Sequence, residues 1–207
     1  MASIASPYGL KAVNLIGGLP YAGSTRSLLL NPAGYGTNIY TGSMVYVKAS
    51  GYVEIATATG ADATTNGMPV GTANTGIVGV CTGFSYTNSQ GQTIFGQYYP
   101  ANSLNGVAYV VDDPNVVFQV QSAGTVAQSA LGLNIAMSVG AVSTGSATTG
   151  NSTGSVVAGA SGSTTTAVFR IIGFVDMQGI SVVGDAFTDI LVKVNPGYHS
   201  YTNAVGL

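Results

Sequence analysis

The sequence predicts an all-β protein, built as a β-sandwich or a β-barrel domain. Val outnumbers Leu by 25 to 11, and 12 Tyr add to a composition that favours strands. The 30 Gly recur at short intervals, as expected where many turns separate short strands. Only 6% of the 207 residues are charged, but 46% are apolar, so the chain has enough hydrophobic side chains to fold as one or two domains.

Residues 44–56 predict the clearest hairpin. Apolar residues alternate with polar or aromatic ones on both sides of a short loop at 49–51, and this loop contains a glycine. Lys48 and Glu54 then face each other across the turn. Such an exposed ion pair contributes a few tenths of a kcal/mol at most, so we interpret it as part of a solvated face.

Later segments predict more strands on each side of turn-forming residues. We expect two further pairs, 77–86 with 93–99 and 107–111 with 116–121, and two more strands near the C-terminus at 167–175 and 188–194. The second of these pairs surrounds residues 112–115, where Pro114 fixes φ and removes a hydrogen-bond donor.

Two segments do not fit an alternating pattern. Residues 125–137 predict a short amphipathic helix, although Gly132 in its middle costs about 1 kcal/mol relative to Ala. Residues 143–166 are almost wholly Ser, Thr, Gly and Ala, so they cannot supply a core of their own. We expect a long surface loop, or an arm ordered by a neighbouring molecule.

The chemistry-bearing residues do not form a catalytic or metal-binding pattern. His199 is the single histidine, and we interpret it as a surface or interface residue. The single Cys81 lies among apolar residues and predicts a small buried side chain. One His and one Cys are too few for a zinc site, and no glycine-rich phosphate loop is present.

The carboxylates do not form a catalytic or metal-binding pattern either. Asp112 and Asp113 are adjacent, and Asp185 and Asp189 flank a short segment, so either pair is a conceivable Ca²⁺ ligand set. Aspartates beside Pro and Gly are more often turn residues. We therefore expect no enzyme activity, no cofactor and no bound metal.

The distribution of charge and the N-terminal residues restrict which partners and which cellular location the sequence predicts. The five basic residues are spread along the sequence, whereas nucleic-acid binders cluster their cations, so we expect no nucleic-acid partner. No uncharged stretch is apolar for long enough to span a membrane as a helix. Residues 1–9 lack the pattern of a signal peptide, which predicts synthesis in a cytoplasm.

Several short motifs resemble one protein family. They are residues 7–13 with Gly17, Gly18, Tyr21, Gly23, Ser24 and Thr25; Gly79, Val80, Gly83, Phe84 and Tyr86; and residues 97–100, 108–114, 117–121 and 190–195. Together these motifs resemble the head decoration, or cement, proteins of tailed bacteriophages.

This resemblance implies a virion structural protein on the outer surface of the capsid. Its partners would be the major capsid protein, whose neighbouring subunits it clamps, and other copies of itself, most commonly in trimers. The chain departs from the pattern at Gln119, where related chains often carry Glu, and in the uncharged segment 143–166. Both departures would alter capsid contacts. An alternative is a tail-fibre or adhesin-like module that binds host glycans through its Tyr-rich faces.

The N-terminal residues predict how the protein would attach to a neighbouring subunit or to the coat lattice. Apolar residues are frequent there but fit neither a strand nor a helix, so we expect an N-terminal arm at 1–25, ahead of a β-rich domain at 26–207. Residues 2–21 would lie on a neighbouring subunit or on the coat lattice. The alternative is an irregular first strand packed on its own core. The candidate contact residues are Pro7, Tyr8, Leu10, Val13, Leu15 and Tyr21.

Overall fold

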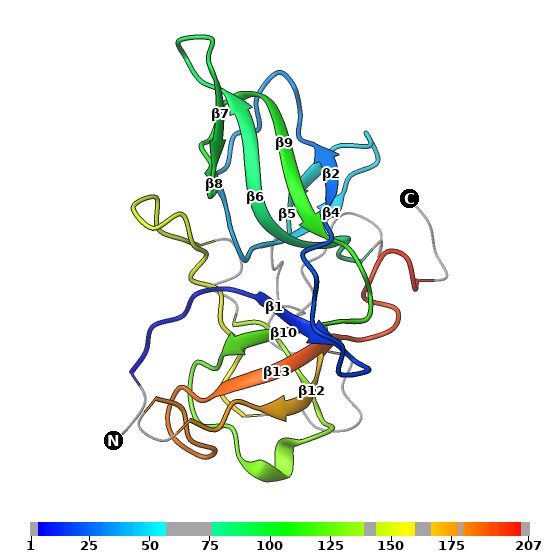
Figure 1. Ribbon diagram of the computed structural model, residues 1–207, viewed down its shortest axis with the longest axis vertical. Helices are drawn as coiled ribbons and strands as arrows, with labels where there is room; N and C mark the ends of the chain where they lie inside the picture. The colour runs from blue at the N-terminus through cyan, green and yellow to red at the C-terminus, as the bar shows by residue number, and fades with distance from the viewer. Residues whose placement is uncertain (1–3, 57–75, 139–143, 160–166, 178–179, 204–207) are drawn as a thin grey trace.

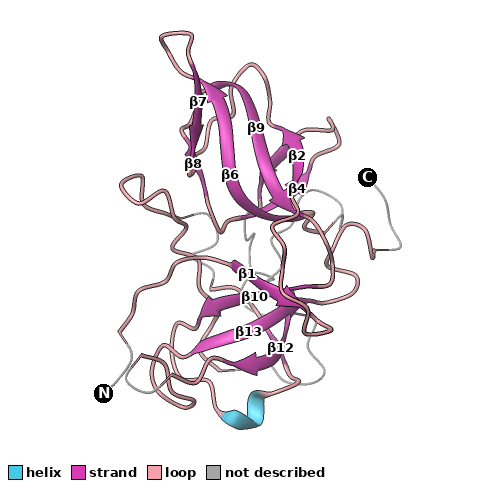
Figure 2. Cartoon of the chain, viewed as in Figure 1, coloured by secondary structure: helices cyan, strands magenta, loops and turns pink. Residues whose placement is uncertain are grey.

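The computed structural model describes residues 4–56, 76–138, 144–159, 167–177 and 180–203. Its regular elements are strands, apart from a single 3₁₀ turn at Gln128–Ala130, which confirms the predicted all-β class. Two antiparallel sheets lie one above the other in Figures 1 and 2, and their strands run in different directions. The arrangement is therefore of the sandwich type.

The lower sheet, called sheet A, combines the N-terminal strand with strands from the second half of the chain. Its order is β1 (Lys11–Leu15), β10 (Val116–Gln121), β13 (Asp189–Val194), β12 (Phe169–Phe174) and β11 (Asn134–Ile135). All neighbours are antiparallel.

The upper sheet, called sheet B, is built from strands between residues 26 and 111. Its order is β2 (Arg26–Leu29), β9 (Leu104–Val111), β6 (Gly79–Thr87), β4 (Met44–Val47) and β5 (Val53–Ile55), with β7 (Thr93–Gly96) also paired to β6. A separate two-stranded sheet joins β3 (Ile39–Tyr40) to β8 (Tyr98–Tyr99).

Two hydrophobic clusters lie on opposite faces of sheet B. Met44 and Tyr46 of β4 belong to the larger cluster, which also contains the inner face of sheet A, whereas Val45 belongs to the smaller cluster. The alternation of a strand thus buries both sides of β4. On sheet A one side faces the larger cluster, through Ile190 and Val192 of β13 among others, and both are 0% exposed.

The predicted hairpins at 44–56 and 77–99 are present. Strands β4 and β5 pair with Val45 opposite Ile55, and Lys48 Nζ lies 2.8 Å from Glu54 Oε1. Strands β6 and β7 pair from Thr87 and Thr93 onward. The second hairpin is shorter than expected, because β7 ends at Gly96 and β8 pairs with β3 instead.

The predicted pairing of 107–111 with 116–121 is wrong. Strand β9 lies in sheet B and β10 lies in sheet A, so residues 112–115 carry the chain from one sheet to the other. The turn is fixed locally, since Asn115 N donates to Asp113 Oδ1 at 2.8 Å. A turn of this kind redirects the chain but does not fix which strand pairs with which. The strands predicted at 167–175 and 188–194 are confirmed as β12 and β13, which pair with each other.

The predicted helix at 125–137 is also wrong. The segment has only the 3₁₀ turn and then enters β11, which pairs with β12. Gly132 has a φ of +82°, a left-handed conformation that ends the turn, and its N–H donates to the Ile171 carbonyl at 2.9 Å. Tertiary pairing here outweighs a weak helical pattern.

The described part of the Ser/Thr/Gly-rich segment, 144–159, is a loop packed on its own chain. Val156 is 0% exposed and bridges to Ser122 and Met137, while Ser152 N donates to the Thr41 carbonyl at 2.8 Å. Small residues allow this close approach: a Cβ on Gly145 would lie 2.2 Å from the Tyr40 ring. Of the two predicted alternatives, a loop or an arm, these residues form the loop.

The expectation of an N-terminal arm needs correction for residues 11–15, which form β1 at the edge of sheet A. The register shifts between Ala12 and Asn14, so Val13 is an extra residue in a β-bulge. This bulge breaks the alternation by which a strand is recognised in a sequence. The alternative, an irregular first strand packed on its own core, describes these residues.

Candidate functional site

The outer face of sheet A is the candidate interaction surface. Directly opposed residues of antiparallel strands point to the same side of a sheet. Lys11, Gln119 and Leu191 are opposed in one row across β1, β10 and β13. In the next row, Val117, Lys193 and Arg170 are opposed across β10, β13 and β12. Because Phe118 and Val192 between these rows face the core, both rows face outward.

This face gathers three of the five basic residues. Lys11 and Arg170 are exposed, and Lys193 is half-buried. The other two cations are paired in sheet B: Arg26 Nε lies 2.5 Å from Asp112 Oδ2, and Lys48 pairs with Glu54. No further ion pair is present among the described residues, so the charges of sheet A are not neutralised by a carboxylate in direct contact. The sequence spreads these residues over 182 positions, from 11 to 193, and the strand order brings them together.

A hydrogen-bonded cluster attaches the segment before β1 to the row that contains Lys11 and Gln119. The Tyr8 hydroxyl donates to Asp189 Oδ1 at 3.0 Å, and Gln119 Nε2 donates to Oδ2 of the same carboxylate at 3.3 Å. Lys11 Nζ lies 4.2 Å from the centre of the Tyr8 ring, a cation–π contact. Burial, and then the charge of Asp189, raise the pKa of Tyr8, so its hydroxyl stays protonated and donates.

The backbone before Tyr8 is held in a similar way. Ser6 N donates to Gln121 Oε1 at 2.8 Å, and Gln121 Nε2 donates to the Ile4 carbonyl at 3.2 Å. The segment from Ile4 to Tyr8 therefore lies along one end of sheet A, where β10 ends and β13 begins.

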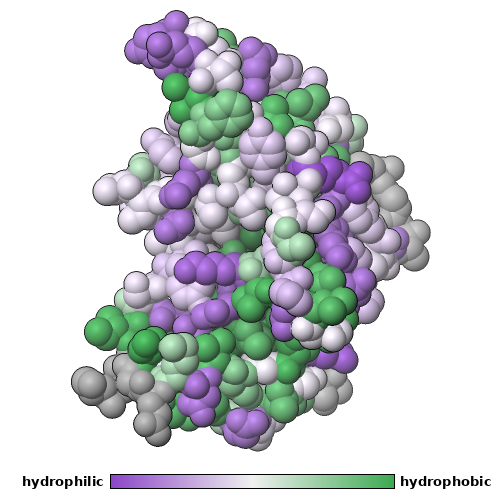
Figure 3. All heavy atoms as spheres, in the orientation of Figure 1, coloured by the Kyte–Doolittle hydropathy of each residue, from purple (hydrophilic) through white to green (hydrophobic). Residues whose placement is uncertain are grey.

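Exposed apolar side chains lie at both ends of sheet A. At the outer end of β1, Val13, Ile16 and Leu19 are 41%, 51% and 66% exposed. At the other end, Ile4, Met177 and Ile180 are 81%, 51% and 62% exposed. In Figure 3 the lower half of the molecule, over sheet A, shows hydrophobic surface broken by polar groups. Exposed hydrophobic surface bordered by polar residues is typical of surfaces that contact another protein.

Three of the six predicted contact residues face the protein's own core. Leu10 is 3% exposed and belongs to the larger hydrophobic cluster, so the prediction that it contacts a partner is wrong. Leu15 and Tyr21 are half-buried and pack against the same cluster. The apolar composition that suggested an arm instead reflects, for these residues, the inner side of an edge strand.

The other three lie at the surface of sheet A. Val13 is the exposed bulge residue, and Tyr8 is half-buried in the cluster with Asp189. Pro7 is half-buried and lines a small cavity of about 210 Å³ together with Gln121 and Phe187. The apolar N-terminal pattern identified this region. Arg170 and Lys193 have no such signal in the sequence, because only the sheet order reveals that they are close to each other.

His199 is buried, which corrects its interpretation as a surface or interface residue. Its side chain is 2% exposed because the C-terminal turn pairs with Ile77, whose N–H donates to the Tyr198 carbonyl at 2.8 Å. Nδ1 accepts the Tyr201 N–H at 3.2 Å. Burial lowers the pKa of His199, so the ring is held in its neutral form.

The surroundings of Cys81, and of the adjacent Asp112 and Asp113, are those of residues that stabilise the fold. Cys81 is 0% exposed, as predicted, and burial raises the pKa of its thiol. Asp112 accepts hydrogen bonds from Arg26 and from the Tyr201 hydroxyl at 3.0 Å, while Asp113 accepts the N–H within its own turn. Within the described ranges, no group of three or more His, Cys, Asp or Glu residues is placed to hold a metal ion.

Within the part of the chain that the structure describes, no helix is long and apolar enough to cross a membrane.

Comparisons with protein-family models, with curated proteins and with solved structures found no match. The resemblance to phage decoration proteins thus remains a prediction from the sequence motifs.

Proposed function

We propose that this protein is a virion structural protein that binds the outside of a phage head and cements neighbouring major capsid subunits. The observation that carries the proposal is the surface of sheet A. Its outer face holds three cations that have no carboxylate partner among the described residues, and exposed apolar side chains lie at both of its ends. The sequence motifs that resemble cement proteins support the same function.

The chemistry of this face fits contact with a protein lattice. Apolar groups such as Val13 and Leu191 stabilise a contact by leaving water, at roughly 25 cal/mol per Å² of buried surface. Lys11, Arg170 and Lys193 favour a partner surface that carries carboxylates and disfavour other orientations. Since the whole chain carries only 12 charges, five basic and seven acidic, neighbouring copies on a shell would repel one another weakly. A homo-oligomer, most simply a trimer, is part of this proposal.

The test is binding to purified phage heads that lack the protein, followed by sedimentation and electron cryomicroscopy. The wild type is expected to cosediment and to add density on the outer surface. Lys193→Gln and Arg170→Gln, on sheet A, are expected to weaken binding several-fold at low salt. Lys48→Gln removes the same charge from sheet B and is the matched control.

Two results would contradict the proposal. The first is a wild-type protein that stays in the supernatant. The second is a Lys48→Gln variant that loses as much affinity as the sheet A variants, because binding would then depend on net charge rather than on this face.

A further inference from the structure

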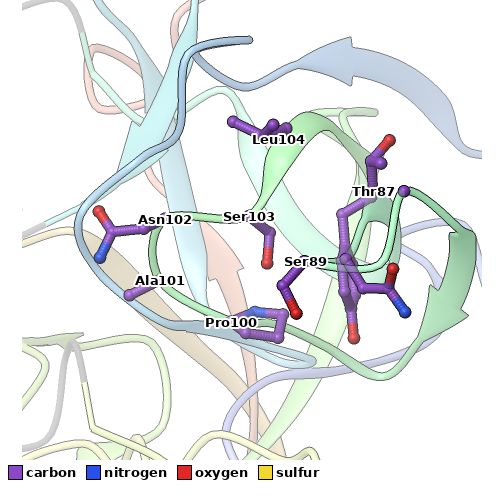
Figure 4. A pocket seen from close by; sticks show the side chains of 10 residues that line it. Thr87, Ser89, Pro100, Ala101, Asn102, Ser103 and Leu104 are labelled. Carbon is purple, nitrogen blue, oxygen red and sulfur yellow. The ribbon is translucent and has the colours of Figure 1, made fainter.

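A second, separate feature is an open cavity at the end of sheet B that is distant from sheet A. It has a volume of about 610 Å³, within the range of small-molecule sites. The turn at 87–91 between β6 and β7 forms one wall, and the loop at 100–104 between β8 and β9 forms the other. Figure 4 shows this loop and turn from close by.

The lining of the cavity is entirely uncharged. Its apolar part contains one aromatic ring, that of Tyr86, together with Pro100, Ala101 and Leu104. Its polar part contains hydroxyl and amide groups, from Thr87, Asn88, Ser89, Asn102 and Ser103. In Figure 4 the side chains of Ser89, on the turn, and Ser103, on the loop, both lie between the two walls, whereas Asn102 points away from the cavity.

The walls are held in place without a ligand. Asn88 Oδ1 accepts the N–H groups of Gln90 and Gln92 at 3.0 and 2.9 Å, which fixes the turn. Asn102 has a φ of +62°, and its N–H donates to the Tyr35 carbonyl at 2.8 Å. A site formed in advance loses less conformational entropy when a ligand binds.

The Tyr86 ring is also held in place by a second aromatic ring. The Tyr86 ring meets the buried Tyr99 ring edge-on, with 5.9 Å between the ring centres. Tyr99 is 0% exposed and packs in the smaller hydrophobic cluster of sheet B. Tyr86 is thus a positioned and half-exposed ring, next to hydroxyl groups.

We propose that this cavity binds a neutral saccharide of one or two sugar units. A pyranose ring has an apolar C–H face, which suits the Tyr86 ring and Pro100, and a rim of hydroxyl groups. Each sugar hydroxyl both donates and accepts, as do the hydroxyls of Ser89 and Ser103, so the two sets can satisfy each other. The uncharged lining provides no cation for a phosphate or carboxylate group, so charged sugars are disfavoured.

This inference does not depend on the proposed function. The cavity is built from sheet B and its loops, whereas the proposed capsid contact uses sheet A (Figure 1). Loss of sugar binding therefore leaves head binding unchanged, and each activity can fail alone.

The test uses saturation-transfer NMR on the full chain with the methyl glycosides of glucose, galactose, mannose and N-acetylglucosamine. At least one is expected to bind with a Kd on the order of 1 mM, as the size of a single sugar allows. Glucose 6-phosphate and sialic acid are the charged comparators and are expected to bind more weakly.

Variants locate the site. Ser89→Trp adds a bulky ring at an exposed turn position and is expected to abolish binding by filling the cavity. Ser50→Trp makes the same change at the exposed β4–β5 turn and is the control. Ser103→Ala removes one hydroxyl and is expected to weaken binding about three- to tenfold.

Three outcomes would overturn the inference. No signal from any of the four neutral sugars at about 10 mM, roughly ten times the expected Kd, is the first. Binding that survives in Ser89→Trp is the second, because the sugar would then occupy another surface. The third is equal or tighter binding of the charged comparators.

Discussion

Leu10→Ala tests whether the N-terminal segment belongs to the fold. Leu10 lies just before β1, is 3% exposed and belongs to the larger hydrophobic cluster. Its N–H donates to the Gly42 carbonyl at 3.0 Å. Gly9 before it has a φ of +78°, and an added Cβ there would lie 2.8 Å from that of Ser152. The backbone at this point is therefore closely fitted to the rest of the chain.

The expected loss follows from this burial. Complete burial of a leucine side chain contributes about 1.5–3 kcal/mol, and a cavity left by the substitution raises the total cost to about 2–5 kcal/mol. Since the closely fitted backbone around Leu10 limits relaxation into the cavity, we expect a decrease of about 3 kcal/mol in the free energy of unfolding. In a chain of this length that lowers Tm by roughly 6–12 °C.

The assay is urea unfolding followed by circular dichroism, with thermal unfolding as a second measurement. Ile4→Ala is the control, because Ile4 is 81% exposed and its truncation is expected to change the free energy of unfolding by less than about 0.5 kcal/mol. If Leu10→Ala unfolds at the same urea concentration as the wild type, the segment is an arm and its assignment to the core is wrong.

Three further predictions concern single contacts. Gly79→Ala would place a Cβ 2.1 Å from a backbone oxygen of β9 and is expected to destabilise by about 1–3 kcal/mol in urea unfolding, whereas Gly17→Ala, with open space around it, is expected to be neutral. Burial lowers the pKa of His199 below its ordinary 6.5, so the unfolded state binds the proton more tightly. The contribution of His199 to the free energy of unfolding is therefore complete above about pH 6.5 and decreases as the pH falls. His199→Gln is expected to remove this part of the pH dependence, as measured by unfolding curves. Tyr8→Phe removes the hydrogen bond to Asp189 and is expected to cost about 0.5–1.5 kcal/mol, measured by the same unfolding curves; an unchanged midpoint would mean that this bond does not hold the segment.

Local sequence patterns correctly predicted the parts of the fold that local interactions determine. The hairpin of β4 and β5 follows from alternating residues around a glycine turn, and its paired residues are at most ten positions apart, from Val45 to Ile55. The pairing of β10 is different. It lies between β1 and β13, whose residues Lys11 and Leu191 are opposed to Gln119 from distant parts of the chain. No short-range pattern specifies such partners, so the local sequence pattern wrongly favoured pairing of β10 with the strand that precedes it.

The candidate surface was predicted in part for the same reason. Apolar residues near the N-terminus indicated a contact region, and Val13 does lie exposed there. The burial of His199 and the grouping of the basic residues depend on contacts between remote segments, His199 with Ile77 and Arg170 with Lys193. These contacts have no signature in a window of neighbouring residues.

Strand β1 has two sides with different consequences for function. Ala12 and Leu15 face inward and pack against the core, whereas Lys11 and Asn14 are opposed to outward residues of β10. Deleting residues 1–19 removes both sides together, so the loss of head binding by such a protein would not distinguish an anchor from an unfolded sheet. Lys11→Gln changes the outer side alone. Weaker head binding by Lys11→Gln with an unchanged Tm would assign the contact to this face, and unchanged binding would exclude Lys11 from it.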